Sequence, residues 1–116
     1  MTIREIIQLL DAKVLLGENS LDRKVYSGCG SDLMSDVLAF VKENTILITG
    51  LTNQHVIRTA SMVDINCILF ARGKMPDEEM LKEAKELDLV IMSTEKTAYT
   101  ACGILYKCGL PGVEHA

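Results

Sequence analysis

The sequence predicts a single α/β domain, with a mixed, mostly parallel sheet flanked by helices in a three-layer arrangement. Three short apolar runs begin at Ile46, Cys67 and Leu89, so that successive runs start 21 and then 22 residues apart. Four consecutive apolar residues without alternation are typical of a strand that is covered on both faces. An interval of about 20 residues holds one strand, one turn, one helix and a return turn. We therefore expect repeated strand–helix units.

The first part of the chain is predicted to form a helix and two strands. Thr2 and Glu5 have the spacing of a capping box, and apolar residues follow at helical intervals, which predicts a helix over Thr2–Leu10. Short strands are expected over Lys13–Leu16 and Lys24–Ser27, with a turn between them.

A flexible loop is predicted next, because two glycines lie between Ser27 and Ser31. Ser31 or Asp32 is expected to cap the following helix. The residues predicted to face inward on that helix are Leu33, Val37, Leu38 and Val41.

Each of the three apolar runs is followed by a helix signal. Thr52 or Asn53 is expected to cap the first helix, Pro76 lies in the predicted first turn of the second, and Thr94 is expected to cap the third. Gly109 should end the last helix, and residues 112–116 should be frayed. The predicted inner stripes are Val56, Ala60 and Val63, then Met80, Ala84 and Leu87, and last Ala98, Ala101, Cys102 and Leu105.

Composition narrows the protein class. The 116 residues form one predicted domain, 1–116, with its core over about 2–110. The net charge is −4 and no basic block occurs, which argues against nucleic acid and anionic membranes as partners. No apolar stretch has the length of a membrane span and no signal-peptide pattern is present, so we expect a soluble cytoplasmic protein.

The four cysteines do not have the spacing of a metal site. They lie at positions 29, 67, 102 and 108, and no C-x-x-C pair occurs. We expect reduced structural thiols, no metal and no cofactor, with Cys29 as the one accessible thiol.

No catalytic motif is present either. The phosphate-binding G-x-x-x-x-G-K-[ST], the dinucleotide G-x-G-x-x-G and the nucleophile-elbow G-x-S-x-G patterns are all missing. His55 has no suitable nucleophile near it in the sequence and is expected to be a surface residue. The sequence therefore predicts no catalytic residues.

The turns after the three apolar runs are the candidate binding site. If the strands are parallel, these turns lie along one edge of the sheet, where helix N-termini, hydroxyl groups and cationic side chains suit a phosphate or a carboxylate. Helix capping and ordinary turn chemistry explain the same residues without any ligand. The candidate ligand-binding residues are Thr49, Gly50, Thr52, Asn53, Arg72, Gly73, Lys74 and Thr94.

Three segments give the chain a family resemblance. They are 30–37 (GSDLMSDV), 46–52 (ILITGLT) and 68–73 (ILFARG), continued by Met-Pro-Asp at 75–77, the Leu-Val-Ile-Met run and Ser93-Thr94. Over nearly the whole chain, from about Thr2 to Leu110, this pattern resembles the DRTGG domain family. The counterparts of the family's characteristic residues are Asp32, Thr49, Gly50 and Gly73, with Arg58 or Arg72 as the arginine.

The resemblance implies a regulatory role rather than catalysis. DRTGG domains occur beside CBS domains in regulated pyrophosphatases and in front of some phosphotransacetylases, and they resemble the N-terminal domain of HPr kinase. We expect a regulatory or ligand-sensing module that binds an adenine nucleotide or another phosphorylated small molecule. The alternatives are an interaction subunit that docks on a partner enzyme and, third, a small phosphate-handling enzyme.

A homodimer is also expected. Its predicted surface is the small-residue face of the last helix, formed by Ala98, Ala101 and Cys102.

Overall fold

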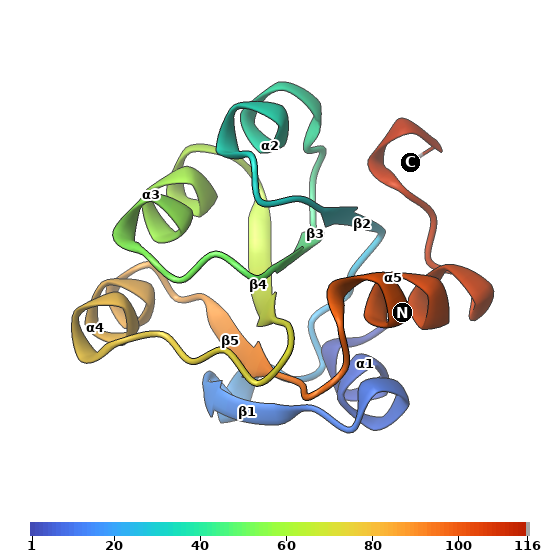
Figure 1. The fold of residues 1–116 in the computed structure, drawn as a ribbon, viewed down its shortest axis with the longest axis horizontal. Coiled ribbons are helices and arrows are strands. Elements are labelled where there is room, and N and C mark those ends of the chain that lie inside the picture. Colours follow the sequence, from blue (N-terminus) through green and yellow to red (C-terminus); the bar gives the residue numbers. More distant parts are fainter. Residues whose placement is uncertain (116) are drawn as a thin grey trace.

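A five-stranded sheet lies between two layers of helices in the computed structural model, which describes residues 1–115 (Figure 1). The prediction of a three-layer α/β domain is confirmed. The helices are α1 (Ile3–Leu10), α2 (Met34–Phe40), α3 (Gln54–Met62), α4 (Glu78–Glu86) and α5 (Ala98–Lys107), with short 3-10 helices η1 (Glu18–Ser20) and η2 (Val113–His115). The strands are β1 (Lys13–Leu16), β2 (Ser27–Gly30), β3 (Thr45–Thr49), β4 (Ile65–Phe70) and β5 (Val90–Ser93).

The sheet is mixed and mostly parallel, as predicted. Its strand order is β1-β5-β4-β3-β2. Neighbouring strands from β2 to β5 are parallel, whereas β1 pairs antiparallel with β5. Because β3, β4 and β5 run the same way, the turns that follow them leave from the same edge of the sheet.

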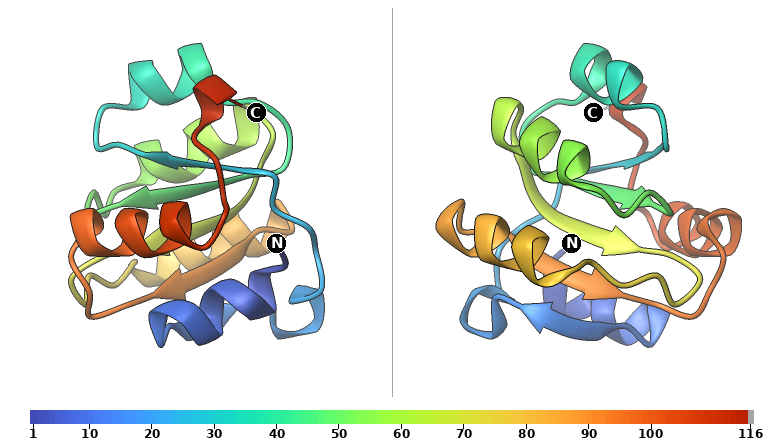
Figure 2. Two further views of the ribbon diagram at one scale, coloured as in Figure 1. Left: turned by 90° about the vertical axis from the view of Figure 1, so that its right-hand side faces the viewer. Right: turned by 60° about the vertical axis from the view of Figure 1, so that its left-hand side comes forward.

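The helices cover both faces of the sheet. The three connecting helices α2, α3 and α4 lie on one face, and α1 and α5 lie on the other (Figures 1 and 2). Ile46 and Ile48 of β3 pack toward α1 and α5, whereas Leu47 between them packs toward α2 and α3. Both faces of the inner strands are therefore buried, which is why their sequences are apolar without alternation.

Strand β2 differs from the prediction. The strand lies over Ser27–Gly30, where a flexible loop was expected, and not over Lys24–Ser27. Its residues pair in register with Thr45 to Ile48 of β3. The glycines also have packing reasons: a Cβ on Gly30 would lie 2.6 Å from the Cys102 sulfur. Backbone pairing to a strong neighbouring strand thus forms a strand from residues of low β-propensity.

The prediction of which α2 residues face inward was also wrong in part. Met34 and Val37 are buried, but Leu33 and Leu38 are 58% and 39% exposed. The helix begins one residue after Leu33, which itself occupies the N-cap position without a side-chain cap. Neither predicted cap is used, because Ser31 bonds the Leu33 backbone and Asp32 reaches across to the turn after β3.

The ends of two other helices differ in detail from the prediction. Asn53, and not Thr52, caps α3. Helix α4 begins at Glu78 under an Asp77 cap, so Pro76 precedes it, and Leu87 beyond its end is 39% exposed. Leu89 replaces Leu87 in the core, because the chain turns back to the sheet there.

Helix α5 packs its small residues inward. Ala101 is fully buried, and Ala98 and Cys102 pack against the same core cluster as α1. The face that was predicted to form a dimer surface therefore contacts the sheet, and this reason for a dimer was wrong. The dimer itself stays a prediction.

The C-terminal segment is more ordered than expected. Gly112 forms a parallel bridge to Gly28 of β2, and Val113 is only 8% exposed. This segment therefore covers part of the open edge of the sheet, which explains why it is not frayed. Ala116, the last residue of the predicted tail, lies outside the described residues.

Candidate functional site

The three turns of the candidate site form one hydrogen-bonded unit. Ala71 N–H donates to the Thr49 carbonyl at 3.0 Å, which joins the turn after β4 to the turn after β3. Arg72 and Gly73 donate from their backbones to Lys96 and Thr94, each at 2.8 Å, and so join it to the turn after β5. The structure therefore brings all three predicted turns together at one edge of the sheet.

Asp32 occupies part of the predicted anion site. Its Oδ1 accepts from the Thr49 hydroxyl at 2.7 Å and from the Gly50 N–H at 2.9 Å. These hydrogen bonds, first the one from Thr49 and then the one from Gly50, lower the pKa of Asp32. Because both groups already donate to Asp32, neither the hydroxyl of the fully buried Thr49 nor the Gly50 N–H is an open donor for a ligand.

A second carboxylate lies at Gly73. A Cβ at this position would lie 2.8 Å from a Glu95 carboxylate oxygen. Gly73 and Arg72 also have left-handed backbone conformations, with φ of 68° and 57°. Glycine suits both requirements at position 73, the close approach and the positive φ.

Four of the predicted residues remain exposed at this edge. They are Thr52, Asn53, Arg72 and Lys74. Asn53 caps α3 by accepting from the His55 N–H at 3.0 Å, and His55 is exposed as predicted. The exposed groups that suit an anion are thus the Arg72 and Lys74 side chains on the turn after β4.

Thr94 is a buried tie between distant segments and not a helix cap. Its hydroxyl donates to the Leu10 carbonyl at 2.8 Å, and Thr97 caps α5 in its place. Thr94 is 3% exposed, so the bond forms away from solvent. It holds the C-terminal end of α1 against the turn after β5.

Replacing Thr94 by Val should therefore lower the free energy of unfolding by about 1–3 kcal/mol, because the buried Leu10 carbonyl loses its donor. The matched control is Thr59→Val. Thr59 is also fully buried, but its hydroxyl has no hydrogen-bond partner within residues 1–115. We expect Thr59→Val to be neutral or stabilising in urea unfolding, since valine removes an unsatisfied polar group. Equal losses in the two variants would contradict this assignment.

Two adjoining cavities lie beside β2, the outermost strand on one side of the sheet, and not at the strand ends where the three turns lie. One, of about 610 Å³, lies between β2, α5 and the 110–112 segment, and the other, of about 780 Å³, lies between β2, α2 and the C-terminal residues. None of the eight candidate ligand-binding residues lines either cavity. Sequence reasoning missed this region, although two tyrosines on a helix with a single charged residue, Lys107, were a usable signal.

The thiols have the character of structural groups. Burial raises the pKa of Cys67, and burial is also the main cause of the raised pKa values of Cys29 and Cys102. A protonated thiol is a poor nucleophile and metal ligand. Cys108 is exposed and Cys29 is half-buried, which reverses the predicted accessibility. Within residues 1–115, no group of three or more His, Cys, Asp or Glu side chains is placed to hold a metal ion.

Family comparison supplies the remaining evidence. The model of the DRTGG domain family matches residues 5–108. The chain belongs to the DRTGG domain family. In this DRTGG domain, the hydrogen bonds of Asp32 link three of the four family counterparts that the sequence resemblance identified, namely Asp32, Thr49 and Gly50.

A solved structure has the same fold. It is the crystal structure of the CBS and DRTGG domains of the regulatory region of Clostridium perfringens pyrophosphatase, complexed with the activator diadenosine tetraphosphate. The TM-score is 0.75 at 19% sequence identity, and the match covers 97% of our DRTGG domain and 49% of that chain. At this identity the likeness shows the fold alone. The DRTGG domain matches none of the curated proteins with which it was compared.

None of the helices within residues 1–115 combines the length and the apolar character that crossing a membrane requires.

Proposed function

We propose that this DRTGG domain is a non-catalytic regulatory module that senses a phosphorylated small molecule at the turn edge of its sheet. The observation that carries the proposal is the joined set of three turns, with the Arg72 and Lys74 side chains exposed on the turn after β4. Membership of a family that includes part of a pyrophosphatase regulatory region supports the regulatory role. An adenine nucleotide is the ligand class that we propose.

The candidate residues divide into two groups by their contacts. Thr52, Asn53, Arg72 and Lys74 are the exposed groups that would contact the ligand. The other four would hold the turns in place, because their hydroxyl or backbone groups already bond within the domain or lie against a carboxylate. These framework residues are Thr49, Gly50, Gly73 and Thr94.

The two carboxylates at the edge limit the affinity. Asp32 and Glu95 place negative charge next to Gly50 and Gly73, where it opposes a phosphate. An exposed charge-assisted contact contributes only about 1–3 kcal/mol. We therefore expect an affinity no tighter than micromolar.

Replacing Arg72 by Ala should weaken nucleotide binding by roughly ten- to a hundredfold, because the guanidinium would supply the charge-assisted contact. Stability should hardly change, since Arg72 and alanine carry the same Cβ at this positive φ. Isothermal titration calorimetry with AMP, ADP, ATP and diadenosine tetraphosphate measures the effect. Arg58→Ala, an exposed arginine on α3, is the matched control and should bind like the wild type.

A second function is favoured by one observation: several donors at the edge are already satisfied by the domain's own groups. An interaction subunit that docks on a separate enzyme needs no open phosphate site. Absence of heat with all four nucleotides, or equal affinity in Arg72→Ala, would favour this function over ligand sensing. The cytoplasmic location stays a prediction.

A further inference from the structure

Helix α2 is the one α-helix within residues 1–115 that begins without a side-chain cap. Hydroxyl, amide or carboxylate side chains cap α1, α3, α4 and α5, whereas Leu33 at the N-cap of α2 makes no such hydrogen bond. Asp32, the residue before Leu33, is of a type that is strongly preferred as a cap. The structure therefore has an uncapped helix next to a carboxylate that is bonded elsewhere.

Asp32 occupies the turn after β3 in the manner of a bound anion. Its Oδ1 accepts from the Thr49 hydroxyl at 2.7 Å and from the Gly50 N–H at 2.9 Å. Hydroxyl and backbone N–H groups just beyond the carboxyl end of a parallel strand are the donors that suit a phosphate oxygen. The carboxylate therefore takes the place that the phosphate of a ligand would need.

The space beside Gly50 is closed by Asp32. Apart from the chain neighbours of Gly50, the only described heavy atoms within 4 Å of a Cβ built there are the two Asp32 carboxylate oxygens, at 3.8 and 4.0 Å. Asp32 is exposed, so its side chain has solvent to move into. Backbone hydrogen bonding already joins the turn of Arg72 and Lys74 to Thr49. Departure of the carboxylate would thus free two donors next to a turn with two cations.

We propose that Asp32 is a built-in competitor of the phosphorylated ligand: the phosphate displaces it from Thr49 and Gly50, and the freed carboxylate caps α2. This inference rests on the proposed function, and it describes how that same site is regulated. Thr49 and Gly50 then belong to the framework in the free domain and to the contact residues in the bound domain.

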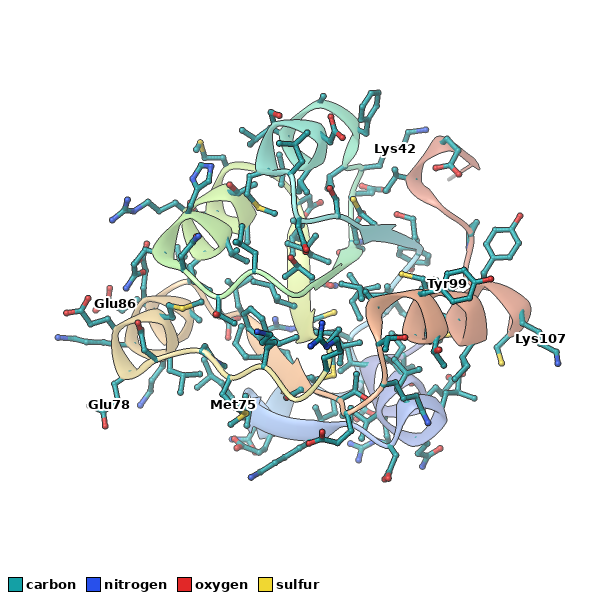
Figure 3. The ribbon with its side chains drawn as sticks, in the orientation of Figure 1. Lys42, Met75, Glu78, Glu86, Tyr99 and Lys107 are labelled. Carbon is teal, nitrogen blue, oxygen red and sulfur yellow. The ribbon has the colours of Figure 1, made fainter. Side chains whose placement is uncertain are left out.

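A cap from Asp32 would extend α2 by one residue. The helix would begin at Leu33, and the carboxylate would accept from the N–H of Met34 or Ser35, the second and third residues after the cap. The negative charge would also complement the helix dipole. Figure 3 shows Lys42 at the outer surface, just beyond the far end of α2, so the helix lies at the rim of the molecule. Ligand binding would thereby change the first turn of a surface helix.

The two positions of Asp32 are similar enough in hydrogen bonding to act as a switch. The carboxylate gives up two hydrogen bonds at the turn and gains one or two at the helix. A phosphate carries more charge than a carboxylate and takes over both donors. The ligand therefore binds only the arrangement in which Asp32 has left, and it shifts the population toward that arrangement.

The first test removes the competitor. In isothermal titration calorimetry, ATP should bind Asp32→Ala roughly ten- to a hundredfold more tightly than the wild type, because the two donors lose their internal acceptor. Asp32→Asn keeps an acceptor oxygen and should fold even where Asp32→Ala does not. It loses the charge, so it should bind ATP roughly three- to tenfold more tightly. The matched control is Asp36→Asn, the same loss of charge at an exposed position on α2, which should bind like the wild type.

The outcomes separate this inference from ligand sensing itself. Binding by the wild type without any gain in the Asp32 variants would overturn the inference and leave ligand sensing in place. An equal gain in Asp36→Asn would assign the effect to net charge and would also overturn it. Heat with the Asp32 variants but not with the wild type would support both proposals, and no heat with any variant would overturn both.

The second test locates the phosphate. Adding Thr49→Val to Asp32→Ala removes a hydroxyl that the first change leaves unpaired, so the double variant should be at least as stable as Asp32→Ala. It should bind ATP roughly tenfold more weakly than Asp32→Ala, because the phosphate loses a donor. Equal affinities of the two variants would contradict a phosphate at Thr49.

Amide hydrogen exchange tests the movement of Asp32. At saturating ATP, the Met34 or Ser35 amide should exchange at least roughly threefold more slowly in the wild type and in Asp32→Asn, since aspartate and asparagine both cap helices. Alanine at position 32 has no capping group, so exchange in Asp32→Ala should not respond to ATP. Unchanged exchange in both capping forms, or equal slowing in Asp32→Ala, would contradict the cap.

Discussion

Replacing Phe70 by Ala is expected to lower the free energy of unfolding by about 3–5 kcal/mol. Phe70 heads the fully buried side chains by volume, and it ends β4 in register with Thr49 and Ser93. Removal of its ring would leave a cavity directly beneath the turns of the candidate site. Urea unfolding followed by circular dichroism measures the loss.

Phe40 provides the matched control, because it is the other of the two phenylalanines and is 62% exposed. Phe40→Ala should change stability by less than about 1 kcal/mol. A loss below this value for Phe70→Ala would mean that the core under the turns rearranges to fill the gap.

Replacing Asp32 by Ala is expected to lower the free energy of unfolding by about 1.5–3 kcal/mol. The change leaves the buried Thr49 hydroxyl and the Gly50 N–H without their acceptor, although Asp32 itself is exposed. Asp32→Asn keeps one oxygen acceptor and should lose less stability. The comparison of the two variants separates the hydrogen bonds from the charge, and equal losses would assign the effect to the charge.

The charge of Asp32 also predicts a dependence of stability on pH. Its pKa is lowered in the folded state, so the unfolded chain binds the proton more tightly. The stabilisation is therefore fully present above the unfolded value of about 3.9, and it is lost as pH falls through the lowered folded pKa. The stability difference between the wild type and Asp32→Asn should shrink below about pH 4. Asp64→Asn, at another exposed carboxylate, serves as the control.

The repeated units of the fold were predictable because a strand that is buried on both faces has a continuous apolar sequence. The runs at Ile46, Cys67 and Leu89 are apolar because helices cover each strand twice. Strand β2 has no such apolar run. Its Ser-Gly-Cys-Gly sequence forms a strand because β3 offers backbone partners, and this cause lies in a different segment of the chain.

For the candidate site, only the shared position of the three turns could be predicted from the sequence. Parallel strands determine that the three turns share an edge, so Thr49, Arg72 and Thr94 were correctly brought together. The bonding of their side chains was not predictable from local pattern. Asp32 lies 17 residues before Thr49, and Leu10 lies 84 residues before Thr94. Which acceptor each hydroxyl meets is determined by the topology of the folded chain and not by the residues next to it in the sequence.

The strand order has a consequence for synthesis of the chain. In the described structure, the partner strand of β1 is β5, which begins at Val90. During translation, the partner strand of β1 is therefore synthesised only after most of the chain, whereas β2, β3 and β4 can pair as they emerge. Over that interval the apolar face of α1, with Ile3, Ile6 and Leu10, lacks its α5 cover. We therefore expect closure of the long loop between β1 and β5 to be a late step of folding, and nascent chains arrested before Val90 to be prone to aggregation.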